Sequence, residues 1–168
     1  MALTALLDRI AHDPDCAVLP AAGQPNIDSA HVVPEDVRAF YDVCGGVTIG
    51  RGSEYEVRLV GPDECVLANN VILGDTLLRD LANRVPEELQ RDASWDWYLI
   101  ADLWNGDYLV IDAGQARNGA CYDAHWETYM DTYHDRMPAI ASALTSLLER
   151  LYANKGRYWY WLEPGFES

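Results

Sequence analysis

Apolar residues recur at helical spacing in three stretches of the chain. Residues 2–12, 34–44 and 138–153 each carry apolar side chains about three and four positions apart, which places them on one face of a helix. The second helix would begin at Pro34, whose missing N–H costs nothing in a first turn, and Gly45-Gly46 would supply its left-handed stop. These three stretches predict amphipathic helices near both ends of the chain.

The strongest strand signal lies in residues 97–112, where two apolar runs flank Asn105-Gly106. Asn-Gly favours a two-residue type I′ turn, because both turn residues then adopt positive φ. Such a loop would pair Asp102 with Leu109 across the hairpin. Alternation would place on one face Ile100, Asp102 and Trp104, and on the other Leu99, Ala101 and Leu103. Both faces carry apolar side chains, so we expect this hairpin to lie inside a sheet.

Shorter patterns complete the chain between these elements. The further strands that we predict are 47–49, 55–60 and 120–123, with 126–130 continuing the last or forming another. The remaining segments are an irregular connection over 16–29 and two short helices over 62–70 and 75–85. Helices at both ends around a run of antiparallel strands predict an α+β domain.

The composition and charge restrict the possible partners. A chain of 168 residues suits one domain, and its 27 acidic against 12 basic residues give a formal charge of −15. Such a chain repels phosphate backbones, so we expect no nucleic-acid partner and instead a basic protein partner. The amino end has no signal-peptide pattern, and no apolar run is long enough to span a bilayer. We therefore expect a soluble, cytoplasmic protein with no membrane partner.

The four cysteines and the histidines do not form a recognisable metal motif. Cysteines without a C-x-x-C pair, in a chain with this much core, are typical of reduced and packed thiols. Cys121, Asp123 and His125 alternate, so a strand would present all three on one side, with His134 as a possible fourth ligand. The paired spacing of established metal sites is missing. We expect neither a metal nor a cofactor.

Acidic and aromatic residues are interleaved around the hairpin. Between residues 87 and 135, eleven carboxylates are opposed only by Arg91 and Arg117. Aromatic anchors within a charged rim are typical of protein-binding surfaces. The candidate partner-binding residues are Asp92, Trp95, Asp96, Asp102, Trp104, Asp107, Asp123, Trp126 and Glu127. The alternative is that Trp97 and Trp104 are core residues and the carboxylates form a solvated rim, with Asp107 serving the turn and Asp112 capping a second turn at Gly114.

Catalysis finds less support in the sequence. Asp102 and Asp107 would return to one face of the predicted hairpin, and paired carboxylates can serve acid–base chemistry or bind a hard metal ion. No motif places a histidine, lysine or tyrosine beside them, and the chain has neither a phosphate-binding glycine loop nor a nucleophile elbow. We predict a non-catalytic protein.

The order of these motifs resembles the SUKH superfamily, which includes yeast cell-wall assembly regulators and many bacterial immunity proteins. The resemblance covers residues 32–152. Its motifs are the helix end Phe40-Tyr41-Asp42-Val43-Cys44-Gly45-Gly46, the run 55–60 leading into Gly61-Pro62-Asp63, the hairpin segment 100–112, the run Gly119-Ala120-Cys121-Tyr122-Asp123, and the closing helix 140–151. The first helix, the connection 16–29 and the aromatic tail 158–168 depart from the family pattern.

The resemblance implies a mixed, largely antiparallel sheet of about five or six strands with helices packed around it. It also implies a protein-binding domain without established catalysis, whose bacterial members neutralise polymorphic toxins, often nucleases. We therefore predict one SUKH-like domain over residues 1–168 that occludes a cognate toxin. A regulatory or scaffold domain with an endogenous partner is the alternative, followed by a small metal- or ligand-binding enzyme. The tail Tyr158-Trp159-Tyr160-Trp161 would be either packed or an adhesive patch, and packing is favoured.

Overall fold

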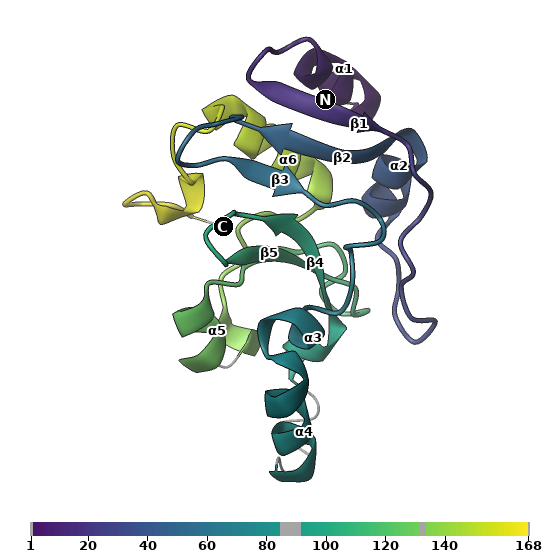
Figure 1. Ribbon diagram of the computed structural model, residues 1–168, viewed down its shortest axis with the longest axis vertical. Helices are drawn as coiled ribbons and strands as arrows, with labels where there is room; N and C mark the ends of the chain where they lie inside the picture. Colours follow the sequence, from purple (N-terminus) through teal and green to yellow (C-terminus); the bar gives the residue numbers. More distant parts are fainter. Residues whose placement is uncertain (1, 85–91, 132–133, 168) are drawn as a thin grey trace.

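The computed structural model describes residues 2–84, 92–131 and 134–167. Within these residues, six strands form one sheet in which every neighbouring pair is antiparallel and the strands follow the order of the chain (Figure 1). The strands are β1 (Cys16–Pro20), β2 (Cys44–Ile49), β3 (Val57–Leu59), β4 (Trp97–Asp102), β5 (Tyr108–Asp112) and β6 (Cys121–Asp123). The α+β prediction is confirmed, with a sheet that is antiparallel throughout the described strands.

Apolar side chains form a core on each face of the sheet. The larger core joins the sheet to α1 (Leu3–Ala11), α2 (Glu35–Val43) and α6 (Leu144–Asn154). The smaller core lies around Trp97 and includes residues of α3 (Ala68–Ile72) and α5 (Trp126–Asp131). The remaining long helix, α4 (Gly74–Arg84), projects away from the sheet (Figure 1). Among the described residues, no helix has both the length and the apolar character needed to cross a membrane.

The first two predicted helices are confirmed, but the third begins later than predicted. Residues 138–143 do not join α6, because Ile140 donates its N–H to the Cys121 carbonyl at 2.8 Å and the Ala141 carbonyl accepts the Cys121 N–H at 2.8 Å. This extended segment therefore covers the outer edge of β6. The helix starts at Leu144, where the Thr145 N–H donates to the Asp36 carboxylate of α2 at 2.8 Å.

Gly45 and Gly46 do not form the predicted left-handed stop. The helix α2 passes directly into β2, with Cys44 already extended at φ −147° and ψ 158°. A Cβ on Gly45 would lie too close to the Pro20 carbonyl of β1, and one on Gly46 would lie 2.9 Å from the Leu59 carbonyl of β3. Both glycines are needed because the neighbouring strands approach closely on either side.

The predicted irregular connection over 16–29 is wrong for its first five residues. Cys16 to Pro20 form the edge strand β1, which pairs with β2 from Cys16 opposite Ile49 to Leu19 opposite Gly46. The register shifts before Pro20, so the proline stands at the end of the ladder, where its missing donor is tolerated. The pairing partners lie 24 to 33 residues further along the chain, a separation that local sequence patterns do not show.

The central hairpin is confirmed, but its predicted register is wrong. Asp102 pairs with Tyr108 and not with Leu109, because the connection runs over residues 103–107 and is closed by the Leu103 N–H and the Asp107 carbonyl at 3.1 Å. In addition to Gly106, the residue of this connection that has a positive φ is Trp104, not Asn105. The register also shifts between Leu99 and Ala101, so the predicted alternation fails there: Ile100, Ala101 and Leu103 all join the larger core.

Three other predicted segments differ from the structure. The possible strand over 126–130 is the helix α5, whose first N–H groups are accepted by side chains: His125 donates to Asp123 Oδ1 at 3.1 Å and Trp126 to Asp107 Oδ1 at 3.1 Å. The predicted helix over 62–70 starts only at α3, after a turn. The helix predicted over 75–85 is α4, which begins at Gly74, and residue 85 lies outside the described residues.

The aromatic tail is packed, as favoured. Tyr160 and Trp161 are buried in η4 (Tyr160–Leu162), a 3-10 turn. The rings of Trp159 and Trp161 stack with centroids 5.9 Å apart. Tyr160 Oη donates to the Ile140 carbonyl at 2.9 Å, so the tail closes over the segment that covers β6.

Candidate functional site

The nine candidate residues lie at opposite ends of β4. Asp92, Trp95 and Asp96 come before this strand, in and beside η2 (Ala93–Asp96). The other six lie where β4 ends, where β5 begins and where β6 leads into α5. The six residues of β4 are joined by five steps of about 3.3 Å, which separate the two ends of the strand by roughly 17 Å. The candidates therefore form two groups rather than one patch.

The first group is tied into the fold. Asp92 pairs with His134 Nδ1 at 2.7 Å and accepts the Ser94 N–H at 2.9 Å. Burial raises the pKa of Asp92, but the hydrogen bonds from His134 and Ser94 outweigh it and bring the pKa down to about 2. Asp96 pairs with His31 Nε2 at 3.2 Å. These contacts position η2, and partner binding by this group stays a prediction.

Trp104 dominates the second group. The residue is 60% exposed, and its backbone has φ +63°, a left-handed conformation that is uncommon for a bulky residue. Asp102 Oδ1 accepts the Trp104 N–H at 2.7 Å and so fixes the turn. The Arg58 guanidinium carbon lies 5.2 Å from the centre of the indole, within cation–π range. The alternative of a core residue is wrong for Trp104, although Trp97 is fully buried.

Arg58 also binds the carboxylate of Asp102. Its Nη2 donates to Asp102 Oδ2 at 3.2 Å, and its two terminal nitrogens bind both oxygens of Glu64 at 2.6 and 2.8 Å. The hydrogen bond from Arg58 lowers the pKa of Glu64, partly opposed by burial. Local sequence patterns contain no signal for this cluster, because Arg58 stands opposite Asp102 only through the pairing of β3 with β4.

Asp107 and Asp123 position the start of α5. Asp107 accepts the Trp126 N–H at 3.1 Å and the Asn105 side-chain amide at 3.0 Å. Asp123 accepts the His125 N–H at 3.1 Å and the Trp161 indole N–H at 2.7 Å. Burial raises the pKa of Asp123, and these two hydrogen bonds partly oppose the increase. The prediction that Asp107 belongs to the turn is confirmed.

Three large apolar side chains are exposed beside these carboxylates. Trp104 at 60%, Trp126 at 47% and Met130 at 43% come from the hairpin connection and from α5. We call this region the hairpin-end surface and define it by Asp102, Trp104, Asp107, Trp126, Glu127 and Met130. Single exposed apolar side chains are ordinary, but two indoles and a methionine beside acidic groups have the composition of a protein-binding surface.

Asp112 has the structural role that was predicted, and a larger one. Its Oδ1 accepts the Gly114 N–H at 2.7 Å, which caps the turn. Its Oδ2 accepts the Trp97 indole N–H at 2.9 Å and Arg117 Nε at 3.0 Å. The carboxylate is fully buried, and burial raises its pKa although all three donors oppose the increase. This group joins the start of β4 to the end of β5 and is not available to a partner.

The possible metal set is not assembled in the described part of the chain, where no group of three histidine, cysteine or acidic side chains has the geometry to hold an ion. Cys121 is fully buried and its thiol lies 3.5 Å from the Gly119 carbonyl, while Asp123 is engaged by Trp161. All four cysteines are buried free thiols. Burial raises the pKa of Cys44 to about 11 and that of Cys65 to about 12, so neither is a reactive thiolate.

A full-length relative decides the family. Over 168 residues the chain is 34% identical to the immunity protein YokJ of Bacillus subtilis (strain 168), an alignment that covers all of this chain and 93% of that protein. The chain belongs to the YokJ family of immunity proteins. No family model matches the chain.

Kinship with YokJ confirms the predicted functional class. An immunity protein acts by binding, so the relationship to YokJ implies a non-catalytic protein, as the sequence predicted. Asp102 and Asp107 agree with this conclusion, since their carboxylates are committed to Arg58 and to backbone and side-chain N–H groups of the fold.

Proposed function

We propose that this protein binds a cognate toxin and neutralises it by stoichiometric occlusion, with the hairpin-end surface as the binding face. The full-length identity to YokJ is the observation that carries this proposal. We further propose that the chain is a single SUKH-like domain acting in the cytoplasm. The order of its motifs along the sheet supports that assignment.

The indoles of the hairpin-end surface suit the role of anchors. Interface hot spots are enriched in tryptophan because the ring buries a large area with few rotatable bonds. Trp126 is held at the first turn of α5 by Asp107, and Trp104 is held between its own turn and Arg58. The Trp104 ring and the backbone of Trp126 are therefore held in place before binding, which lowers the entropy lost when a partner covers them.

The charge of the chain favours a basic toxin, and we propose a nuclease. An excess of 15 negative charges attracts a cationic groove built to hold a phosphate backbone. Glu127 is exposed at the hairpin-end surface and can pair with a lysine or arginine in such a groove. An acidic surface seated there excludes the nucleic-acid substrate.

Co-expression with the protein encoded by the neighbouring gene tests this function. We expect the pair to co-purify at one to one and cells producing the neighbouring protein to survive only when this protein is present. Trp126→Ala should weaken the complex by at least tenfold, as removal of a hot-spot residue does. The matched control is Leu19→Ala, which truncates an apolar side chain of similar exposure (53%) on the edge strand β1. A neighbouring protein that still kills would refute the pairing, and equal losses for both variants would refute the binding face.

A further inference from the structure

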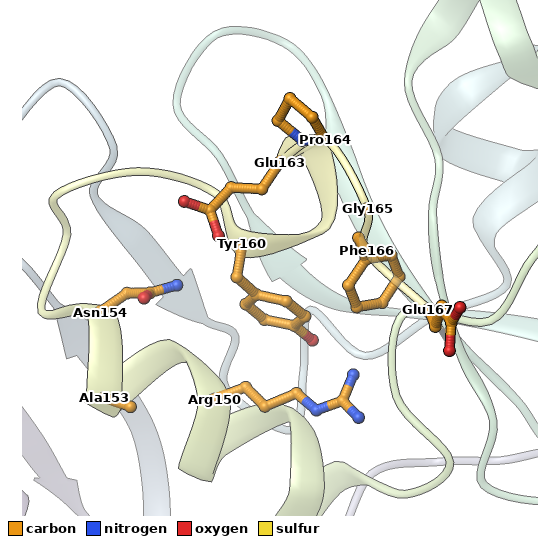
Figure 2. A pocket seen from close by; sticks show the side chains of 9 residues that line it. All are labelled: Arg150, Ala153, Asn154, Tyr160, Glu163, Pro164, Gly165, Phe166 and Glu167. Carbon is orange, nitrogen blue, oxygen red and sulfur yellow. The ribbon is translucent and has the colours of Figure 1, made fainter.

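An open pocket lies between the tail and α6. It has a volume of about 400 Å³, within the usual size of ligand sites, and lies between the last turns of α6 and residues 163–167 (Figure 2). Arg150 and Asn154 line it from α6, Tyr160 and Phe166 from the tail, and Glu163 and Glu167 add two carboxylates. Nothing in the function proposed above uses this pocket.

The floor of the pocket is fixed in place. Arg150 Nη1 and Tyr160 Oη both donate to the Ile140 carbonyl, at 2.8 and 2.9 Å. The guanidinium of Arg150 lies 5.5 Å from the ring centre of Tyr160 and 5.6 Å from that of Phe166. The arginine is thus stacked against two rings and anchored to the backbone, so it supports the pocket walls.

Asn154 leaves a hydrogen-bond donor unused inside this pocket. The residue is 8% exposed, and its side-chain Nδ2 is buried and has no hydrogen-bond partner within the described residues. Figure 2 shows this amide nitrogen directed toward the space beside Tyr160 and Glu163. An unpaired buried donor destabilises a fold by about 1–3 kcal/mol and is rare in native proteins. A ligand oxygen at this point would satisfy it.

The tail is tied to the residue that precedes α5. Trp161, the residue after Tyr160, donates its indole N–H to Asp123 at 2.7 Å. Asp123 in turn accepts the N–H of His125, which precedes Trp126. The tail and the start of α5 are therefore joined through one carboxylate, and a protein seated on Trp126 can extend a segment toward the pocket.

We propose that the pocket receives an extended basic segment of the toxin. A main-chain carbonyl of that segment accepts the hydrogen bond of Asn154 Nδ2, and a lysine or arginine side chain pairs with Glu163 or Glu167. The two exposed carboxylates outnumber the single guanidinium, which is already stacked and bonded, so an anionic segment is disfavoured. This inference rests on the proposed toxin partner and adds a second point of attachment to it.

Asn154→Leu tests the hydrogen bond. The substitution keeps the size of the side chain and removes the unpaired donor, so we expect the melting temperature of the free protein to rise. We expect the affinity for the neighbouring-gene protein, measured by calorimetry, to fall about three- to tenfold, the loss of one neutral hydrogen bond. A merely structural role predicts no loss of affinity.

A second variant tests the charge and does not depend on the first one folding. The double substitution Glu163→Gln with Glu167→Gln should weaken the complex and flatten its salt dependence, whereas Glu35→Gln, an exposed carboxylate on α2, should do neither. If both pocket variants bind as tightly as the unaltered protein, the pocket proposal is overturned while the proposed function stands. If the unaltered protein itself fails to bind, the proposed function fails first.

Discussion

Substitutions at Trp104 separate the backbone strain of the hairpin connection from the contacts of the indole side chain. At φ +63° a residue with a Cβ is disfavoured by about 1–2 kcal/mol. Glycine avoids this strain, but its larger conformational entropy in the unfolded chain cancels roughly 0.5–1 kcal/mol of that gain in stability. Trp104→Gly should therefore be more stable than Trp104→Ala by about 0.5–1 kcal/mol, the reverse of the order in helices and strands.

The comparison with the unaltered protein isolates the indole. Both variants lose the stacking of Arg58 on the ring, which contributes about 0.5–1 kcal/mol at an exposed site. We thus expect Trp104→Gly to be close to the unaltered protein in stability and Trp104→Ala to lie below it. If the indole is an anchor, both variants should lose toxin affinity equally, because neither has the ring.

Urea unfolding followed by far-ultraviolet circular dichroism measures the stability of the three proteins, and calorimetry measures the affinity. Lys155 is a matched control, since it has φ +50° at the end of α6. Lys155→Gly should likewise be more stable than Lys155→Ala, with toxin affinity unchanged in both. If Trp104→Ala equals or exceeds Trp104→Gly in stability, the backbone argument is refuted. If Trp104→Gly keeps full affinity, the indole is no anchor.

Two further predictions concern buried carboxylates. Asp112→Ala should lower the free energy of unfolding by about 1–3 kcal/mol, because it leaves the buried Trp97 indole N–H without an acceptor and removes the cap of the turn at Gly114; a loss below about 1 kcal/mol in urea unfolding would contradict this role. Asp92 has a folded pKa of about 2, below its value of about 3.9 in an unfolded chain, so its contribution of about 2 kcal/mol is complete above pH 4 and is lost as the pH falls toward 2. Asp92→Asn should flatten the pH dependence of stability over that interval, and an unchanged slope would show that the ion pair with His134 does not matter.

The sequence located the central hairpin correctly because its signal is local. Asn105-Gly106 marks a reversal, and the flanking apolar runs mark two strands. The register could not be predicted, because two side chains replace the backbone pattern of a two-residue turn: Asp102 binds the Trp104 N–H, and Asn105 Oδ1 accepts the Asp107 N–H at 2.9 Å. Competition between side-chain and backbone hydrogen bonds therefore decided the loop length.

The remaining errors concern segments whose structure depends on contacts with residues distant in the sequence. Pairing with β2 makes residues 16–20 a strand, and the carboxylate of Asp107 helps turn residues 126–131 into a helix. The same limit applies to the site. The composition indicated an acidic surface with aromatic residues, but Arg58, His31 and His134 reach their carboxylates only through the fold. The sequence could therefore not divide the nine candidates into their two groups.

The four buried thiols are built-in probes of local unfolding. Cys16 lies in β1, Cys44 at the start of β2, Cys65 in the connection after β3, and Cys121 in β6. A thiol reagent reaches each sulfur only when the surrounding structure opens. The order in which the four residues are labelled would consequently report the order in which the sheet comes apart, and a bound toxin would slow labelling in the elements that it clamps.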